Sequence, residues 1–213
     1  MLAKKYYQNL FKPYFREINN GNFKSAQKRL AEIIKCFPSK GWYHQGLLIS
    51  LMNKNKGSDH NTLKQKIFCF KKSLKYDSKN PAAWRALGNA LFSLKKYKES
   101  ESAYKKSLKY SKSALYKNDA MRFLADTAIA KKQYKKAENL LDKILKSKHR
   151  PPYFQIAYHY IKLYQKTGRQ DLVNFWAQKG ITSLKIVEKS GKKAYGPQNA
   201  YQKLQKLFLG YIK

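Results

Sequence analysis

A seven-residue motif that occurs twice is the strongest constraint on what this chain can fold into. Residues 70–76 read FKKSLKY and residues 104–110 read YKKSLKY, so the two copies begin 34 residues apart. Each copy lies in a stretch whose apolar residues recur at the spacing of an amphipathic helix. Such a recurrence predicts copies of one supersecondary unit, in which each copy buries its apolar face against its neighbours.

Residues 80–110 show this unit most clearly, as two amphipathic helices joined by a short polar corner. The first helix carries an apolar stripe made of Trp84, Leu87, Gly88 and Leu91. The second carries a stripe made of Tyr97, Ser100, Tyr104 and Leu108. Because Gly88 has no side chain, a neighbouring helix can approach closely there. Neither helix can bury its apolar stripe alone, so the pair requires further pairs of the same kind.

The spacing of these residues resembles the tetratricopeptide repeat, whose pattern is Trp-x2-Leu-Gly-x2-Tyr, then Ala-x3-Phe, then Pro. This chain has Leu91 in place of the Tyr, Ser100 in place of the Ala, and no terminal Pro. An anchor residue of the second helix recurs at intervals of 34 to 40 residues, at Leu30, Phe70, Tyr104, Leu141 and Ala177. The resemblance implies an all-α solenoid of about five tetratricopeptide-type helical hairpins, with no strands.

The domain organisation follows from these intervals. We expect a tetratricopeptide-repeat solenoid over residues 1–189 and a linker with a C-terminal capping helix over residues 190–213. The five units are expected at about residues 1–38, 39–78, 80–112, 115–149 and 152–187. The last helix has one apolar face, which favours a cap over the final exposed surface of the solenoid. The alternative is a basic amphipathic helix that lies on an anionic membrane.

The charge of the chain indicates which partners it attracts. There are 46 Lys and Arg residues against 12 Asp and Glu, a formal net charge of +34. Such a surface attracts nucleic acid, anionic membranes or acidic proteins. A compositional bias is the competing explanation, because nearly all of the positive charge is Lys and because Lys, Asn, Ile, Tyr and Phe abound together. The lysines concentrate in the second helices, which the resemblance places on the convex side, where RNA could bind.

We find no sequence pattern for catalysis, for a cofactor or for a metal. The histidines are scattered without metal-ligand spacing, and the chain has no glycine-rich phosphate loop. Cys36 and Cys69 lie far apart, which argues against a disulfide framework or a zinc site and fits a reducing compartment. The chain also lacks a signal-peptide pattern and an apolar segment long enough to span a bilayer. We therefore expect a cytoplasmic protein that is not an enzyme.

The resemblance also indicates where a partner binds, because the first helices of successive tetratricopeptide hairpins line a concave groove. Mapping the groove positions onto this chain gives Tyr43, Arg85, Asn89, Arg122, Asp126, Tyr158 and Lys162. The mixed but mostly basic set suits an extended or helical peptide that carries Asp, Glu or a free carboxylate. In the alternative interpretation, Arg85 and Arg122 simply pair with Asp119 or Asp126.

Arg85 and Asn89 are four residues apart and therefore neighbours on one helix face. Family members that hold the acidic C-terminal tails of chaperones use a basic residue and an Asn at these two positions. The next unit has Phe123 where those proteins need an Asn, so the full clamp is absent. We expect a non-catalytic protein–protein interaction scaffold that binds an acidic peptide in this groove. Binding of RNA or another polyanion through the convex lysines is the alternative, and membrane binding is not expected.

Overall fold

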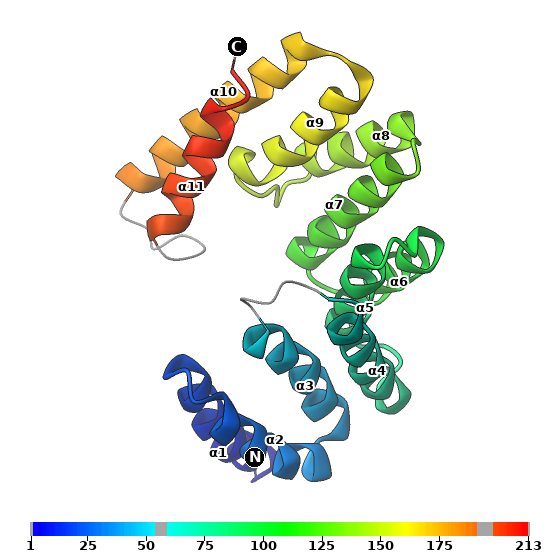
Figure 1. Cartoon of the computed structure of the whole chain (residues 1–213), viewed down its shortest axis with the longest axis vertical. Coiled ribbons are helices and arrows are strands. Elements are labelled where there is room, and N and C mark those ends of the chain that lie inside the picture. Colours follow the sequence, from blue (N-terminus) through cyan, green and yellow to red (C-terminus); the bar gives the residue numbers. More distant parts are fainter. Residues whose placement is uncertain (1, 54–58, 191–197, 213) are drawn as a thin grey trace. The chain divides into compact units, whose positions relative to one another are not determined.

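The computed structural model describes residues 2–53, 59–190 and 198–212, and the regular elements in these ranges are all α-helices (Figure 1). The predicted all-α class, with helical hairpins following one another along the chain, is confirmed. Most of the predicted linker falls on residues 191–197, outside the described residues. Contacts between Cα atoms divide the chain into two compact units, Met1–Tyr110 (unit 1) and Ser111–Lys213 (unit 2).

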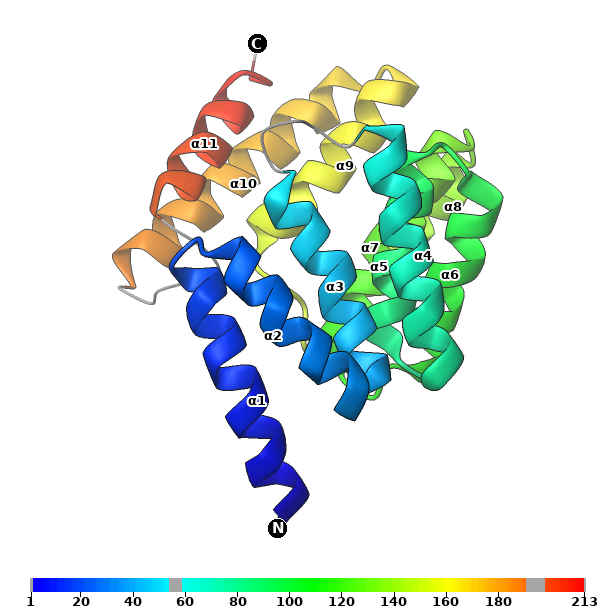
Figure 2. The same cartoon turned by 60° about the horizontal axis from the view of Figure 1, so that its bottom comes forward.

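In unit 1, the residues that the structure describes form three helical hairpins. They are α1 (Leu2–Asn19) with α2 (Phe23–Cys36), α3 (Pro38–Met52) with α4 (His60–Tyr76), and α5 (Pro81–Ser93) with α6 (Tyr97–Tyr110). Helix α2 also packs on α3, and α4 packs on α5, so the hairpins are joined through neighbouring helices (Figure 2). One hydrophobic cluster, around Leu30, joins α1 to α3, and a second, around Phe70, joins α3 to α6.

The described residues of unit 2 form two hairpins and one further helix. The hairpins are α7 (Ala114–Ala130) with α8 (Tyr134–Leu145) and α9 (Tyr153–Thr167) with α10 (Gln170–Lys189), and α11 (Gln198–Leu209) packs on α10. A single hydrophobic cluster includes residues from all five of these helices. Phe208 of α11 is fully buried in it, while Lys203 and Lys206 are exposed. The predicted capping helix is confirmed in this respect, because α11 covers the apolar side of α10.

The aromatic residue that begins each copy of the repeated motif lies directly on a glycine of the preceding helix. A Cβ atom on Gly46 would lie 2.4 Å from the ring of Phe70, and one on Gly88 would lie 2.6 Å from the ring of Tyr104. Gly180 stands in the same relation to the ring of Phe208, at 2.7 Å. Helices therefore pack glycine against aromatic ring in both units, and any side chain larger than hydrogen would force them apart.

The serine inside each copy of the motif ties its helix to the start of the helix before it. Ser73 Oγ donates a hydrogen bond to the carbonyl of Ser39 at 2.7 Å, and Ser107 Oγ donates one to the carbonyl of Pro81 at 2.8 Å. Both serines are fully buried, so these bonds satisfy hydroxyl groups that would otherwise be costly to bury. The motif recurs because its aromatic ring and its serine make the same contacts in two hairpins.

Candidate functional site

The expected groove residues of unit 1 lie on α3 and α5, and the beginning of α5 is firmly fixed. Asn80 Oδ1 accepts hydrogen bonds from the backbone N–H groups of Ala82 and Ala83, both at 3.1 Å. Pro81 occupies the first turn, where its missing N–H costs nothing. The point at which α5 begins is therefore set by a strong N-cap.

Arg85 and Asn89 are one helical turn apart on α5, and Asn89 is oriented by the second helix of its own hairpin. Its Oδ1 accepts a hydrogen bond from the Tyr104 hydroxyl at 2.7 Å. Asn89 is exposed, and within the described part of the chain its Nδ2 group has no hydrogen-bond partner. Because the oxygen is held by Tyr104, the amide presents its N–H donors to solvent, next to the half-buried Arg85.

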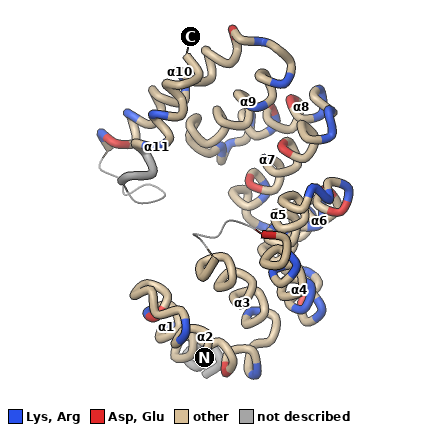
Figure 3. Tube along the Cα trace, viewed as in Figure 1, with Lys and Arg blue, Asp and Glu red and all other residues tan. Residues whose placement is uncertain are grey.

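The helices α3 and α5 carry positive charge and no negative charge. Lys40 is on α3 and Arg85 on α5, and neither helix contains Asp or Glu. Lys40 Nζ lies 3.9 Å from the ring centroid of Tyr7, an attraction that holds the ammonium group near α1. Tyr43 is half-buried, with its ring 6.1 Å from that of Phe70. Figure 3 shows that most basic residues of unit 1 lie elsewhere, on helices such as α4 and α6.

In unit 2, the expected groove residue Arg122 is already paired. Its guanidinium forms a short ion pair with Asp119, one turn earlier on α7, and reaches Gln155 Oε1 of α9 at 3.5 Å. Only 17% of each of the Arg122 and Asp119 side chains is exposed. For Arg122, the structure therefore has the ion pair that the alternative interpretation predicted. A peptide carboxylate would have to compete with Asp119 for this guanidinium.

Asp126 of α7 joins the other two expected residues of unit 2 in one network. Its Oδ1 lies 3.0 Å from His159 Nδ1 and 3.0 Å from Lys162 Nζ, both on α9. The Lys162 ammonium also lies over the ring of Tyr158, 5.3 Å from its centroid. Burial alone would raise the pKa of Asp126, but the hydrogen bonds and charges of His159 and Lys162 outweigh it and lower that pKa. The network ties α7 to α9 and leaves the exposed Tyr158 on its surface.

His159 is the part of this network that the sequence did not reveal. It is 7% exposed, and no metal-ligand or catalytic spacing distinguishes it from the other histidines of the sequence. It follows Asp126 by 33 residues, which is about one repeat length, and this spacing is the signal that could have paired them.

The charge of Asp126 should make the stability of unit 2 depend on pH in a defined way. Because its pKa is lower in the folded state, it stabilises the fold above its ordinary pKa of 3.8 and stops doing so as pH falls through the folded value. Asp126→Asn should therefore reduce the free energy of unfolding by about 1–3 kcal/mol at pH 7 and by progressively less below pH 3.8.

Urea unfolding, monitored through the hydrogen exchange of backbone amides in α7 and α9, measures the difference in free energy of unfolding between wild type and Asp126→Asn. The control is Glu188→Gln, which removes an exposed carboxylate from α10. An Asp126→Asn deficit of the same size at pH 7 and at pH 3 would contradict the ion-pair assignment.

The described residues do not assemble a metal site. No three His, Cys, Asp or Glu side chains come together in that part of the chain as a metal-binding group. Both cysteines are free, and burial raises the pKa of Cys69 to about 11, so its thiol stays protonated. Within the same residues, no helix has the length and apolar character needed to cross a bilayer.

The paired helices and their glycine–aromatic contacts define a helical-hairpin repeat protein. Residues 81–114 match the model of the tetratricopeptide repeat family. This segment contains α5, α6 and the glycine–aromatic pair Gly88 and Tyr104. Residues 81–114 are therefore similar to a tetratricopeptide repeat, and the paired helices on either side of them have the helical-hairpin fold of such repeats.

Solved structures with the same fold cover nearly the whole chain. MamA aligns with a TM-score of 0.61 and 16% identity over 91% of this chain and 97% of its own. PilF of Pseudomonas aeruginosa aligns with a TM-score of 0.62 and 16% identity over 99% of this chain and 95% of its own. A tetratricopeptide repeat protein of Parabacteroides merdae gives 0.56 and 13%, over 95% of this chain and 98% of its own. No curated protein sequence matches the chain. These likenesses establish the fold.

Proposed function

We propose that this protein is a non-catalytic interaction scaffold whose unit 1 binds an acidic peptide segment of a partner protein. The binding surface, which we call the basic face, consists of Lys40, Tyr43, Arg85 and Asn89. Tetratricopeptide folds present such first-helix residues as a recognition surface, and the resemblance places these four together. A cytoplasmic location belongs to the same proposal, and the two free thiols support it.

One observation carries the assignment of an acidic ligand. The Tyr104 hydroxyl fixes the Asn89 amide beside Arg85, on a helix without any acidic residue. A peptide carboxylate can accept hydrogen bonds from the Arg85 guanidinium and from Asn89 Nδ2. The first bond is strong because both groups are charged, and the second is favoured because the Asn89 amide is already oriented. Lys40 adds attraction at longer range, and Tyr43 offers an apolar and a hydroxyl contact.

The expected residues of unit 2 have a different part in the proposal. Arg122 is balanced by Asp119, and Lys162 is balanced by Asp126, so this surface has little net charge for an acidic ligand. Its exposed groups are the Tyr158 ring and part of the Lys162 stem. We assign it to contacts with uncharged side chains or with the backbone of a bound segment.

Charge reversal at Arg85 tests the basic face. Peptides selected from a random displayed library on the full chain, at moderately high salt, should be rich in Asp and Glu. Arg85→Glu should weaken them on the order of 30-fold, because it replaces an attractive contact with a repulsive one. The matched control is Lys98→Glu, the same change of charge at an exposed position on α6 of the same hairpin.

The comparison separates a specific site from the general charge of the chain. Equal weakening by Arg85→Glu and Lys98→Glu would mean that the +34 charge attracts acidic peptides without a site, and would contradict the proposal. Circular dichroism and urea unfolding of both variants show whether the fold is retained. Selected peptides without acidic residues would contradict the assignment of the ligand.

A further inference from the structure

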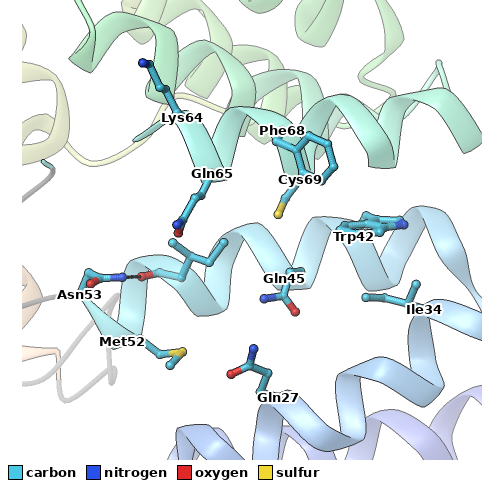
Figure 4. A pocket seen from close by; sticks show the side chains of 11 residues that line it. Gln27, Ile34, Trp42, Gln45, Met52, Asn53, Lys64, Gln65, Phe68 and Cys69 are labelled. Carbon is cyan, nitrogen blue, oxygen red and sulfur yellow. Dashed lines mark hydrogen bonds between the residues drawn. The ribbon is translucent and has the colours of Figure 1, made fainter. Parts of the chain in front are cut away.

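A pocket in unit 1 lies between α2, α3 and α4. Its volume is about 680 Å³, which is in the range of sites that hold ligand groups. The apolar part of its wall comes from Ile34 of α2, Trp42 and Met52 of α3, and Phe68 of α4. Cys69, 3% exposed, also lines the pocket. Figure 4 shows these side chains around a common space between the three helices.

The pocket is on the side of α3 that faces away from the basic face. At 100° per residue, Lys40 and Tyr43 fall on one side of this helix, together with Leu47. Gln45 and Ile49, which line the pocket, fall on the opposite side. The pocket is therefore a separate surface, and a ligand there would not touch Arg85 or Asn89.

The two aromatic rings in the wall of the pocket are held in place by contact with each other, but Phe68 remains largely exposed to solvent. The rings of Trp42 and Phe68 meet edge to face, with centroids 5.8 Å apart and planes at 86°. This contact links α3 to α4 and orients both rings. Phe68 is nevertheless 53% exposed, and Met52 is 45% exposed. An aromatic ring held in place and left half in solvent is the kind of surface that a partner's apolar side chain can bury.

Three glutamine side chains, one from each helix, add hydrogen-bonding groups. They are Gln27 of α2, Gln45 of α3 and Gln65 of α4. Figure 4 shows Gln27 and Gln45 directed toward each other across the pocket. Within the described residues these amides make no hydrogen bonds of their own. Each offers a donor and an acceptor, which is what the N–H and C=O groups of a peptide backbone require.

The helix that forms one wall of the pocket carries positive charge and no negative charge. Helix α4 contains five lysines and no Asp or Glu. Lys64 lines the pocket, and Lys72 Nζ lies over the Phe68 ring, 5.5 Å from its centroid. Among the lining residues, Lys64 is the charged one, so nothing in the wall neutralises a ligand's carboxylates. An acidic ligand is complementary to this rim, and a basic one is repelled.

We propose that this pocket is a second docking site, for an acidic peptide segment of a partner protein that carries one bulky apolar side chain. The apolar side chain enters between Trp42 and Phe68. The glutamine amides bond to the peptide backbone, and Lys64 and Lys72 contact flanking Asp or Glu residues. The proposal depends on none of the residues of the basic face, so an experiment that contradicts one of the two binding sites leaves the other standing.

A displayed library with counter-selection tests the pocket. Random 12-residue peptides are selected on the full wild-type chain at moderately high salt and then depleted on Phe68→Ser. We expect survivors that contain one Phe, Trp, Leu or Met flanked by Asp or Glu, and that bind wild type at least tenfold more tightly than Phe68→Ser. Replacing the apolar residue by Ala, or the acidic residues by Lys, should abolish that difference. Because Phe68 is half in solvent, its replacement should keep the fold and lower the free energy of unfolding only slightly, through loss of the Trp42 ring contact.

Two control variants show whether the selected peptides bind at the pocket or elsewhere on the chain. Phe175→Ser removes a comparably exposed ring, 48% exposed, from unit 2 and should leave binding unchanged. Arg85→Glu should also leave it unchanged, which separates this site from the basic face. The proposal is overturned if no peptide survives depletion, if the survivors lack acidic or bulky apolar residues, or if they lose affinity in Arg85→Glu. Conversion of a dimer to a monomer by Phe68→Ser would also overturn it, because the occupant would then be a second copy of the chain.

Discussion

Gly46→Ala is expected to destabilise unit 1 by about 2–3 kcal/mol, although it adds only one methyl group. The new Cβ would lie 2.4 Å from Cε1 of Phe70, and three atoms of that ring would be closer than 3.0 Å. Phe70 is 1% exposed and sits in the hydrophobic cluster that joins α3 to α6, so the ring has little room to move. Either α3 and α4 separate or Phe70 leaves its preferred conformation, and both lower the free energy of unfolding.

A double-mutant cycle checks this cause directly. Phe70→Leu alone should destabilise the unit, because it leaves a cavity over Gly46. In the double variant, the alanine methyl group occupies part of that space, so the combined loss should be smaller than the sum of the two single losses. Gly210→Ala is the control, since its Cβ would meet nothing closer than 3.5 Å. Strictly additive losses would show that Gly46 is needed for some reason other than the Phe70 ring.

The stability of unit 1 should fall by about 3 kcal/mol between pH 7 and pH 4 because of His44 alone. Burial, reinforced by the charge of Lys40, lowers the pKa of His44 from 6.5 to about 4. The imidazole therefore stays neutral in the folded state over a range in which the unfolded chain binds a proton. Stability due to this residue is complete above pH 6.5 and is lost as pH falls toward 4.

The surroundings of His44 explain why the proton is excluded. Its ring lies 5.2 to 5.5 Å from the rings of Phe11, Tyr14, Phe15 and Tyr43. His44→Leu keeps a similar volume and removes the titration. Urea unfolding at several pH values should show the wild type losing about 3 kcal/mol more than His44→Leu between pH 7 and pH 4. Parallel pH profiles for the two proteins would contradict the assignment.

The fold was largely predictable because the motif residues act locally and in the same way in each hairpin. A neighbouring helix approaches closely at Gly88, as its lack of a side chain predicted, and the residue in contact is Tyr104. The substitution of Ser100 for Ala is accommodated by a hydrogen bond. Ser100 Oγ donates to the carbonyl of Gly88 at 3.0 Å, so the extra hydroxyl is satisfied in a fully buried position. The predicted boundary between solenoid and linker at residues 189 and 190 stays a prediction.

The helices that carry the expected site residues were predictable, but the pairing of the side chains on them was not. Helical spacing placed Arg122 and Asp126 on α7. It could not show whether these charges are available to a ligand or are paired with other charged residues of the chain, as they are in the structure. That choice depends on side-chain rotamers and on contacts between α7 and α9, which no local pattern encodes. The pocket beside Phe68 was missed for a similar reason, since its walls come from three helices. In the sequence, its residues look like ordinary positions on amphipathic helices.

Site-specific photo-crosslinking in a native lysate is the most direct test of the scaffold role. A photoreactive residue at position 82 of α5, the first helix of its hairpin, is compared with one at the exposed position 102 of α6, the second helix. The lysate is treated with nuclease and held at moderately high salt. We predict discrete protein adducts at position 82 that disappear in Arg85→Glu and do not form at position 102. Adducts only at position 102, or adducts that vanish with nuclease, would contradict the proposal and favour polyanion binding through the lysine-rich second helices.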